Sequence, residues 1–329
     1  MRYADSLGFL FSQKELMSHD PLTAANHNVP LELCHVTVAP PIPPMKKMEN
    51  LSKELVWFLG VIAHEKYIRM VHSADDVAQP GLKIIGGLQQ PPEDATLEQL
   101  EFLRRLGVLF MGLAYQDENS FGGGFLAPDA SLTEHGRMFM IMLAKAGMVL
   151  DLSHAGERTA REALDFVEQM TRNGLDLNVV ATHSGCKAVY PHERNLPDDT
   201  IKRIAGLGGF VGIPTLTFIL DENDDSLAPF LRHFMHAKEL VGAEHLTIGT
   251  DGVYKTLDRE EQQAIFNTMK SKLDPDGKIG ARFPDQPAEL NSESKMGWIA
   301  NELYEHGLDS ASVAWVTGEN LIEFVTEAL

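Results

Sequence analysis

Gly147-Met-Val-Leu-Asp-Leu-Ser-His154 is a short apolar run that ends in a histidine, and Leu177-Asn-Val-Val-Ala-Thr-His183 repeats this pattern further along the chain. A third run, His245-Leu-Thr-Ile-Gly-Thr-Asp251, ends in a carboxylate. Each run has the length of a buried strand, so its last residue is expected at the carboxyl end of that strand. In an α/β barrel those ends meet at one rim, where catalytic residues lie. The three endings favour a metal-assisted hydrolase.

Eight such runs can be counted, mostly separated by helical patterns. They cover residues 6–11, 33–39, 82–88, 108–114, 148–153, 178–182, 210–214 and 246–250. Strands interleaved with helices predict a (β/α)8 TIM barrel of the amidohydrolase kind, built as one domain over residues 1–329. The alternative is an open doubly wound sheet, although no Gly-x-Gly-x-x-Gly follows a strand to support a dinucleotide site.

Helix boundaries are marked in several of the intervening segments. Thr96 and Gln99 have the spacing of a capping box, and Thr133 and Gly147 are typical start and stop residues. The expected helices cover residues 49–69, 96–105, 132–146, 158–172, 198–205, 227–241, 292–305 and 310–328. Residues 252–291 are polar and of uncertain structure, and are expected to form a lid over the barrel mouth.

Composition limits the classes of partner. The 329 residues are 44% hydrophobic, enough for a large core, and the net charge of -19 disfavours binding to nucleic acid. Two cysteines exclude a disulfide framework. The N-terminus has no pattern of a secretory signal, and no stretch approaches the roughly 18 apolar residues that span a bilayer. A cytoplasmic protein without membrane contact is therefore expected.

His154 and His183 are the candidate metal ligands. Neutral imidazole binds zinc well, and a catalytic zinc usually has three protein ligands and a water. The two residues end neighbouring strands of the predicted barrel, so their side chains can converge. A single histidine is more often a hydrogen-bonded structural residue, and both roles stay open for this pair.

Three further side chains are candidates for catalysis or binding. Asp251 can act as a general base, although an Asp-Gly turn is its simpler role. Arg194 can hold a substrate carboxylate with two hydrogen bonds, or form a surface ion pair. Tyr115 can donate a hydrogen bond to a developing oxyanion, or be a buried structural tyrosine.

Several phrases in this order resemble the membrane (renal) dipeptidase family of zinc metallopeptidases. They are Asp151-Leu-Ser-His154, Thr182-His-Ser184, Arg194-Asn195 and Gly249-Thr-Asp-Gly252, together with Leu113-Ala-Tyr-Gln-Asp-Glu-Asn119 and Ser131-Leu-Thr-Glu-His-Gly-Arg137. The resemblance runs from about residue 82 to residue 251 and is weaker outside that span.

The resemblance implies a (β/α)8 barrel with a two-zinc site, hydrolysis of dipeptides, and a homodimer. It implies that His154 and His183 bind one zinc and that Asp251 is the catalytic carboxylate. It also implies that Arg194, followed by Asn195, binds the substrate carboxylate.

The chain departs from the family at four positions and therefore looks like a divergent branch. The family's first-strand His-x-Asp pair falls on Leu7 and Phe9, which cannot bind a metal. Its bridging glutamate falls on Gln89, whose neutral amide is a poor bridge between two cations. Tyr115 stands where the family has a histidine. One zinc, held by the two histidines with Gln89 or Asp251, is then expected rather than two.

Three functions remain open from the sequence. The first is a metal-dependent hydrolase that cleaves a dipeptide or related small amide with metal-activated water. The second is a metal-free, inactive barrel that binds a small molecule or peptide. The third is another amide or lactone hydrolase, because a fold does not fix its chemistry.

Overall fold

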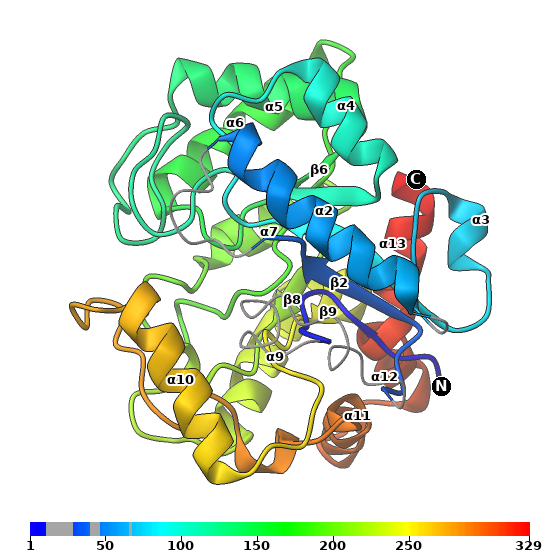
Figure 1. Cartoon of the computed structure of the whole chain (residues 1–329). Coiled ribbons are helices and arrows are strands. Elements are labelled where there is room, and N and C mark those ends of the chain that lie inside the picture. Colours follow the sequence, from blue (N-terminus) through cyan, green and yellow to red (C-terminus); the bar gives the residue numbers. More distant parts are fainter. Residues whose placement is uncertain (11–28, 40–46, 66–67) are drawn as a thin grey trace.

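A computed structural model of the chain describes residues 1–10, 29–39, 47–65 and 68–329. Its centre is a ring of parallel strands, each with near-complete burial, surrounded by helices (Figure 1). The strands are β1 (Ala4–Asp5), β2 (Leu33–Thr37), β4 (Leu82–Leu88), β5 (Val108–Gly112), β6 (Val149–Asp151), β7 (Val179–Val180), β8 (Val211–Ile213) and β9 (Leu246–Ile248).

Hydrogen bonds close this ring. Strands β1, β2, β4, β5, β6 and β7 pair in that order, and β8 pairs with β9. A parallel bridge between Ala181 and Val211 joins β7 to β8, and the Ser6 amide donates to the Ile248 carbonyl at 2.8 Å to join β9 to β1. The predicted (β/α)8 barrel is confirmed.

The helices cover the outside of the barrel, with α4, α5 and α6 gathered on one side and α10 and α11 on the opposite side (Figure 1). The longer ones are α2 (Met48–His64), α4 (Leu97–Arg105), α5 (Glu134–Ala146), α6 (Glu157–Arg172), α7 (Asp198–Gly206), α9 (Ala228–Val241), α10 (Arg259–Leu273), α11 (Lys295–Glu305) and α13 (Asn320–Ala328). Shorter turns are α3 (Ala74–Val77), α8 (Thr217–Leu220) and α12 (Ser310–Ala314).

The C-terminal helix closes the amino-terminal end of the barrel. Phe210 directly precedes β8, and its ring meets Phe324 of α13 edge-on at a centroid distance of 5.0 Å. Phe110 of β5 stacks on Phe324 at 6.4 Å. These aromatic rings fill the amino-terminal end of the barrel. A polar site is therefore expected at the carboxyl rim.

Local sequence rules set the predicted helix ends. The Thr96 side chain accepts from the Gln99 amide in a complete capping box, and the Thr133 side chain accepts from the Gly136 amide. Gly147 ends α5 with a φ of 66°, a left-handed conformation that glycine adopts without strain.

Some predicted boundaries were wrong. The first strand is Ala4–Asp5 instead of residues 6–11, because the Asp5 carboxylate accepts from the Leu7 amide and turns the chain; residue 11 lies outside the described residues. Residues 68–70 are not helical but form β3 (Ile68–Met70), which pairs with β4. The C-terminal helix contains a π-helical turn at Trp315–Glu319, where Gly318 packs against the Arg2 backbone.

The polar segment 252–291 contains a helix that the sequence did not predict, α10, whose Asp258 N-cap accepts from the Glu261 amide. Within the described residues, no helix combines the length and the hydropathy needed to cross a membrane.

Candidate active site

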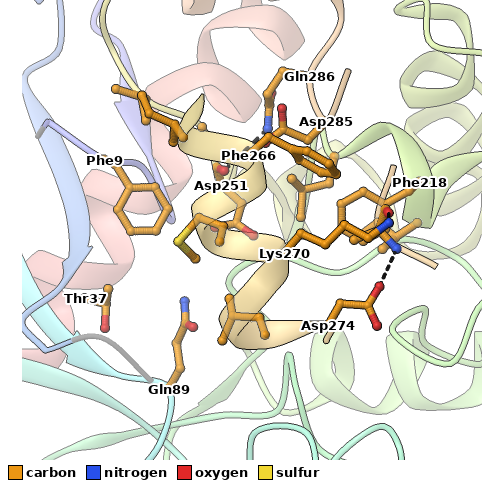
Figure 2. Close-up of a pocket in the computed structure, with 18 of the residues that line it drawn as sticks. Phe9, Thr37, Gln89, Phe218, Asp251, Phe266, Lys270, Asp274, Asp285 and Gln286 are labelled. Atoms are coloured by element: carbon orange, nitrogen blue, oxygen red, sulfur yellow. Dashed lines mark hydrogen bonds between the residues drawn. The ribbon is translucent and has the colours of Figure 1, made fainter. Parts of the chain in front are cut away.

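The carboxyl rim holds a pocket with a cavity volume of about 230 Å³. Four predicted site residues that follow different strands line it: Gln89 after β4, Tyr115 after β5, His154 after β6 and Asp251 after β9. Arg194, from the loop after β7, is a fifth lining residue. Figure 2 shows Gln89 and Asp251 projecting into the pocket. The structure thus brings these five residues to one cavity, whereas the predicted site residues His183 and Asn195 do not line it.

His154 lines this pocket, and His183 lies behind it as a fully buried residue that does not line the cavity. Their Nε2 atoms lie 2.9 Å apart, and both side chains are buried. Burial, and next the positive charge of Arg194, lower the pKa of each imidazole well below its usual range. Both rings are therefore neutral at neutral pH, which is the form that binds a metal ion.

A hydrogen-bonded relay orients the His183 ring. The Thr182 hydroxyl donates to the buried Asp151 carboxylate at 2.6 Å and lies 2.8 Å from Nδ1 of His183. Because that hydroxyl has only one proton, Nδ1 of His183 must be the donor to it. The Nε2 lone pair of His183 then faces His154. A carboxylate that fixes a metal-binding imidazole in this way is common around zinc.

The facing nitrogens need a proton or a cation between them, since two bare lone pairs at 2.9 Å would repel. Zinc–nitrogen bonds of about 2.0–2.1 Å at a tetrahedral angle place two nitrogens about 3.3 Å apart. The pair is thus within a few tenths of an ångström of that spacing. Nδ1 of His154 has no hydrogen-bond partner among the described residues. The histidine pair fits one metal ion.

The second metal of the family does not fit this site. Leu7 is fully buried, and Phe9 lines the pocket as a hydrocarbon wall. Over the described ranges, no group of three or more histidine, cysteine, aspartate or glutamate side chains could hold a metal, so a single ion at the histidine pair would also need a ligand of another residue type. Of the predicted additional ligands, Gln89 is the one with a neutral oxygen. Nη2 of Arg194 lies 3.3 Å from Nε2 of His154, so the guanidinium competes with a metal cation for the lone pair of this nitrogen.

Arg194 is a buried cation rather than a partner in a surface ion pair. Its guanidinium donates to the Ser153 carbonyl and, at 3.1 Å, to the His183 carbonyl. The guanidinium carbon also lies 5.6 Å from the centre of the Phe125 ring. These contacts fix the fork at the pocket wall, and its remaining N–H groups can bind a carboxylate.

Asp251 has an uncommon backbone conformation for a residue other than glycine, with a φ of 50°. Its amide donates to the Leu7 carbonyl at 2.8 Å, which holds this turn against β1. Burial raises the pKa of Asp251 to about 7, although the charge of Arg194 opposes the shift. A carboxyl with this pKa can accept a proton near neutral pH.

Tyr115 stacks on His154 with ring centroids 4.2 Å apart. Burial, and next the charge of Asp251, raise the pKa of the phenol. The hydroxyl therefore stays protonated at neutral pH and can donate a hydrogen bond inside the pocket.

Asn195 takes a different position from the one that the resemblance implied. It does not line the pocket; its amide nitrogen donates to the Tyr190 carbonyl at 2.9 Å and to the Ile219 carbonyl at 2.6 Å. These two hydrogen bonds hold the loop that carries Arg194.

Sequence reasoning missed six charged residues that line the pocket: Glu54, Lys255, Lys270, Asp274, Asp285 and Lys295. Lys295 begins α11, donates to the Val253 carbonyl at 2.8 Å, and lies 5.1 Å from the centre of the Tyr254 ring. Burial lowers its pKa to about 8. Asp285 lies within the segment 252–291, whose structure the sequence pattern did not predict, Lys295 follows it, and no motif marked either residue.

Comparison with known sequences shows which protein family the chain matches. The family model described as Membrane dipeptidase (Peptidase family M19) matches residues 55–260. Dipeptidase tcpJ of Claviceps purpurea is 26% identical over 272 residues, and dipeptidase aclJ of Aspergillus oryzae is 29% identical over 245 residues. These alignments cover 79% and 72% of this chain but only 55% and 49% of the two relatives, so the chain spans about half of their length.

Solved structures share the fold. An amidohydrolase from Pseudomonas aeruginosa has a TM-score of 0.79 at 20% identity, with 99% of this chain and 96% of that chain covered. A metallo peptidase from Rhodobacter sphaeroides, liganded with a phosphinate mimic of the dipeptide L-Ala-D-Ala, has a TM-score of 0.76 at 20% identity. That match covers 100% of this chain and 99% of the other.

Proposed function

Because the chain belongs to the membrane dipeptidase family, we propose that it hydrolyses a dipeptide or a related small amide in the pocket at the barrel rim. The observation that carries the proposal is that neutral His154, the buried Arg194 guanidinium and the Asp251 carboxyl with its raised pKa line one cavity, with His183 in contact with His154 from behind. A relative of known structure that binds a dipeptide mimic supports the substrate class.

Each lining residue has a chemical role in this proposal. Arg194 binds the substrate carboxylate, which fixes the amide relative to the rim. Asp251 accepts the proton of the attacking water and returns it to the leaving amine, as a carboxyl with a pKa of about 7 can do. The Tyr115 hydroxyl donates to the carbonyl oxygen as negative charge develops there.

One zinc ion, held by His154 and His183 with Gln89 as a neutral third ligand, completes the proposal. When bound, such an ion would act as a Lewis acid and promote ionisation of water. The relay from Asp151 through Thr182 keeps the His183 ring in the ligating orientation. A homodimer and a cytoplasmic location remain predictions.

The experiment combines metal analysis with turnover. Protein purified without chelator is expected to contain about one zinc and to cleave dipeptides, while His154→Ala loses both zinc and activity. His306→Ala, at the exposed C-terminal end of α11 and outside the pocket lining, is the matched control and should retain both. Equal dipeptide turnover in His154→Ala would rule out the proposal. Lactones tested in parallel distinguish dipeptide cleavage from other hydrolase chemistry.

A metal-free binding protein is the second candidate, favoured by Leu7 and Phe9 in ligand positions and by the guanidinium beside His154. It predicts tight binding of an uncleaved dipeptide without stoichiometric metal. It also predicts no rise in melting temperature on addition of zinc, because only a ligand that binds the folded state stabilises it.

A further inference from the structure

The outer part of the pocket is built from one face of helix α10. Ile265, Phe266, Met269 and Leu273 line the cavity and form an apolar stripe along α10, and the polar residues Gln262 and Lys270 of the same helix line it as well. Figure 2 shows α10, which carries Phe266 and Lys270, lying across the pocket with Phe9 on one side and Phe218 on the other.

This apolar stripe is incompletely covered by the protein itself. Phe266 is the only buried residue of α10, whereas Ile265, Met269 and Leu273 are only partly buried. An amphipathic helix normally gains its stability by burying such a face. Here the apolar side chains face the cavity, so a ligand with its own apolar group would complete their burial.

The predicted site residues Gln89, Arg194 and Asp251 line the inner end of the same cavity, whereas Gln262 and Lys270 are the polar side chains that α10 adds to the outer part. Arg194 and Asp251 can bind the charged ends and the amide of a dipeptide, and this would place the substrate side chains towards the outer part. Phe9 adds to the apolar lining of the pocket. Its ring stands where the first-strand aspartate of the family would make the wall hydrophilic.

We propose that the pocket selects dipeptides with large apolar side chains, and that Ile265 and Met269 of α10 are residues that determine this specificity. The inference rests on the proposed function, since it takes the inner end of the pocket as the binding site of a dipeptide backbone. It assigns α10 a role in substrate choice beyond covering the barrel.

Binding of uncleavable ligands tests the proposal. Calorimetry would compare two ketomethylene analogues, in which a CO–CH2 unit replaces the amide, with the side chains of Leu-Leu and of Ala-Ala. The native protein is expected to bind the Leu-Leu analogue at least about tenfold more tightly, because burial of the additional methylene groups is favourable.

Two variants locate the preference on α10. Ile265→Gln and Met269→Gln keep side-chain length but make the stripe polar, and each should reduce the ratio of the two affinities at least about fivefold. Asn267→Gln places the same residue on the exposed side of α10 and should leave the ratio unchanged.

The outcomes separate this inference from the proposed function. Equal affinities for both analogues in the native protein would overturn the specificity and leave dipeptide binding intact. A preference that survives both stripe variants would overturn the role of α10. If neither analogue binds at millimolar concentration, the proposed function fails together with the inference.

Discussion

Asp251 combines a left-handed backbone conformation with a carboxyl group whose pKa is raised. The amide of Asp251 is held by the Leu7 carbonyl, so the side chain is directed by the junction between β9 and β1. Such strained residues persist only where surrounding contacts hold them, and they are often found at functional sites. The strand-end position was predictable from the sequence, but the conformation and the raised pKa depend on neighbours distant in sequence.

Replacing Asp251 with asparagine should separate activity from stability. The free carboxyl ionises near pH 3.8 and the folded one near 7, so the metal-free native protein loses stability as the pH rises between these values. Asparagine tolerates a positive φ. After allowance for the partial exposure of residue 251, Asp251→Asn should be more stable than the native protein at pH 8 by about 1–2 kcal/mol. Near pH 4 the two proteins should be equally stable.

Activity should change in the opposite direction. Loss of the general base is expected to lower kcat at least about 100-fold, and native activity should fall as the pH drops below about 7. Urea titrations at pH 4 and pH 8, together with a pH–rate profile, measure both effects. An Asp251→Asn protein with native turnover would exclude the carboxyl as the base.

Arg194 should act through the geometry of its fork as well as its charge. Arg194→Lys keeps the charge but loses the paired hydrogen bonds, so KM for a dipeptide with a free carboxylate should rise about 10- to 100-fold. KM for the same dipeptide with a C-terminal amide should change little. Arg203→Lys, in an ion pair on α7, is the control. An equal rise for both substrates would indicate a structural role.

At the scale of elements, the relay joins the end of strand β6 to Thr182 and His183, which follow β7. The Thr182 hydroxyl links the Asp151 carboxylate to the His183 ring. Thr182→Val keeps the shape but removes the hydroxyl, so zinc affinity should fall about 10- to 100-fold. Competition titration with a zinc chelator measures this change. Thr247→Val removes another buried threonine hydroxyl, bonded to Ser6, and should lower stability without affecting zinc affinity.

Helix α10 depends on its N-cap. Asp258→Ala removes the side chain that accepts from the Glu261 amide and should cost about 1 kcal/mol of local stability. Amide hydrogen exchange in α10 should accelerate, and KM should rise because the pocket wall is less ordered. Thr96→Ala breaks the corresponding capping box of α4, away from the pocket, and should leave KM unchanged. Similar KM values for both variants would contradict a role of α10 in binding.

The elements that the sequence predicted well are those with a strong physical signal. The runs that became β4 and β5 are buried along their whole length, which requires near-continuous apolar residues. Strand β3 was missed because exposed Arg69 lies between its two buried residues. Helix α10 was missed because Phe266 alone is buried, so the hydrophobic pattern is weak. Lys295 and Asp285 follow α10, and their approach to the site therefore depends on tertiary structure.

At the scale of the whole molecule, the barrel is closed by hydrogen bonds between the segment at β1 and the segment at and after β9. Strand β1 has two residues, and Asp5 at its end carries the main side-chain link to the segment after β9. The buried Asp5 carboxylate accepts from the Thr250 amide at 3.0 Å, and from the hydroxyls of Thr250 and Tyr254 at 2.6 Å each. Residues that are 245 positions apart in the sequence are thereby held together.

Asp5→Ala should therefore weaken the entire fold rather than one element. It leaves several buried donors without an acceptor, so the free energy of unfolding should fall by at least about 3 kcal/mol in a transition that remains cooperative. Tyr254→Phe removes one of these hydrogen bonds and should cost about 1 kcal/mol.

The pH dependence gives an independent check on the same residue. Burial raises the pKa of Asp5 to about 6, above the value of 3.8 expected in the unfolded chain. The contribution of Asp5 is thus largest below pH 4 and declines as the pH rises through about 6. The difference between native protein and Asp5→Ala in urea unfolding should accordingly be greater at pH 4 than at pH 8. A small loss, or one confined to the N-terminal strand in hydrogen exchange, would show that other contacts close the barrel.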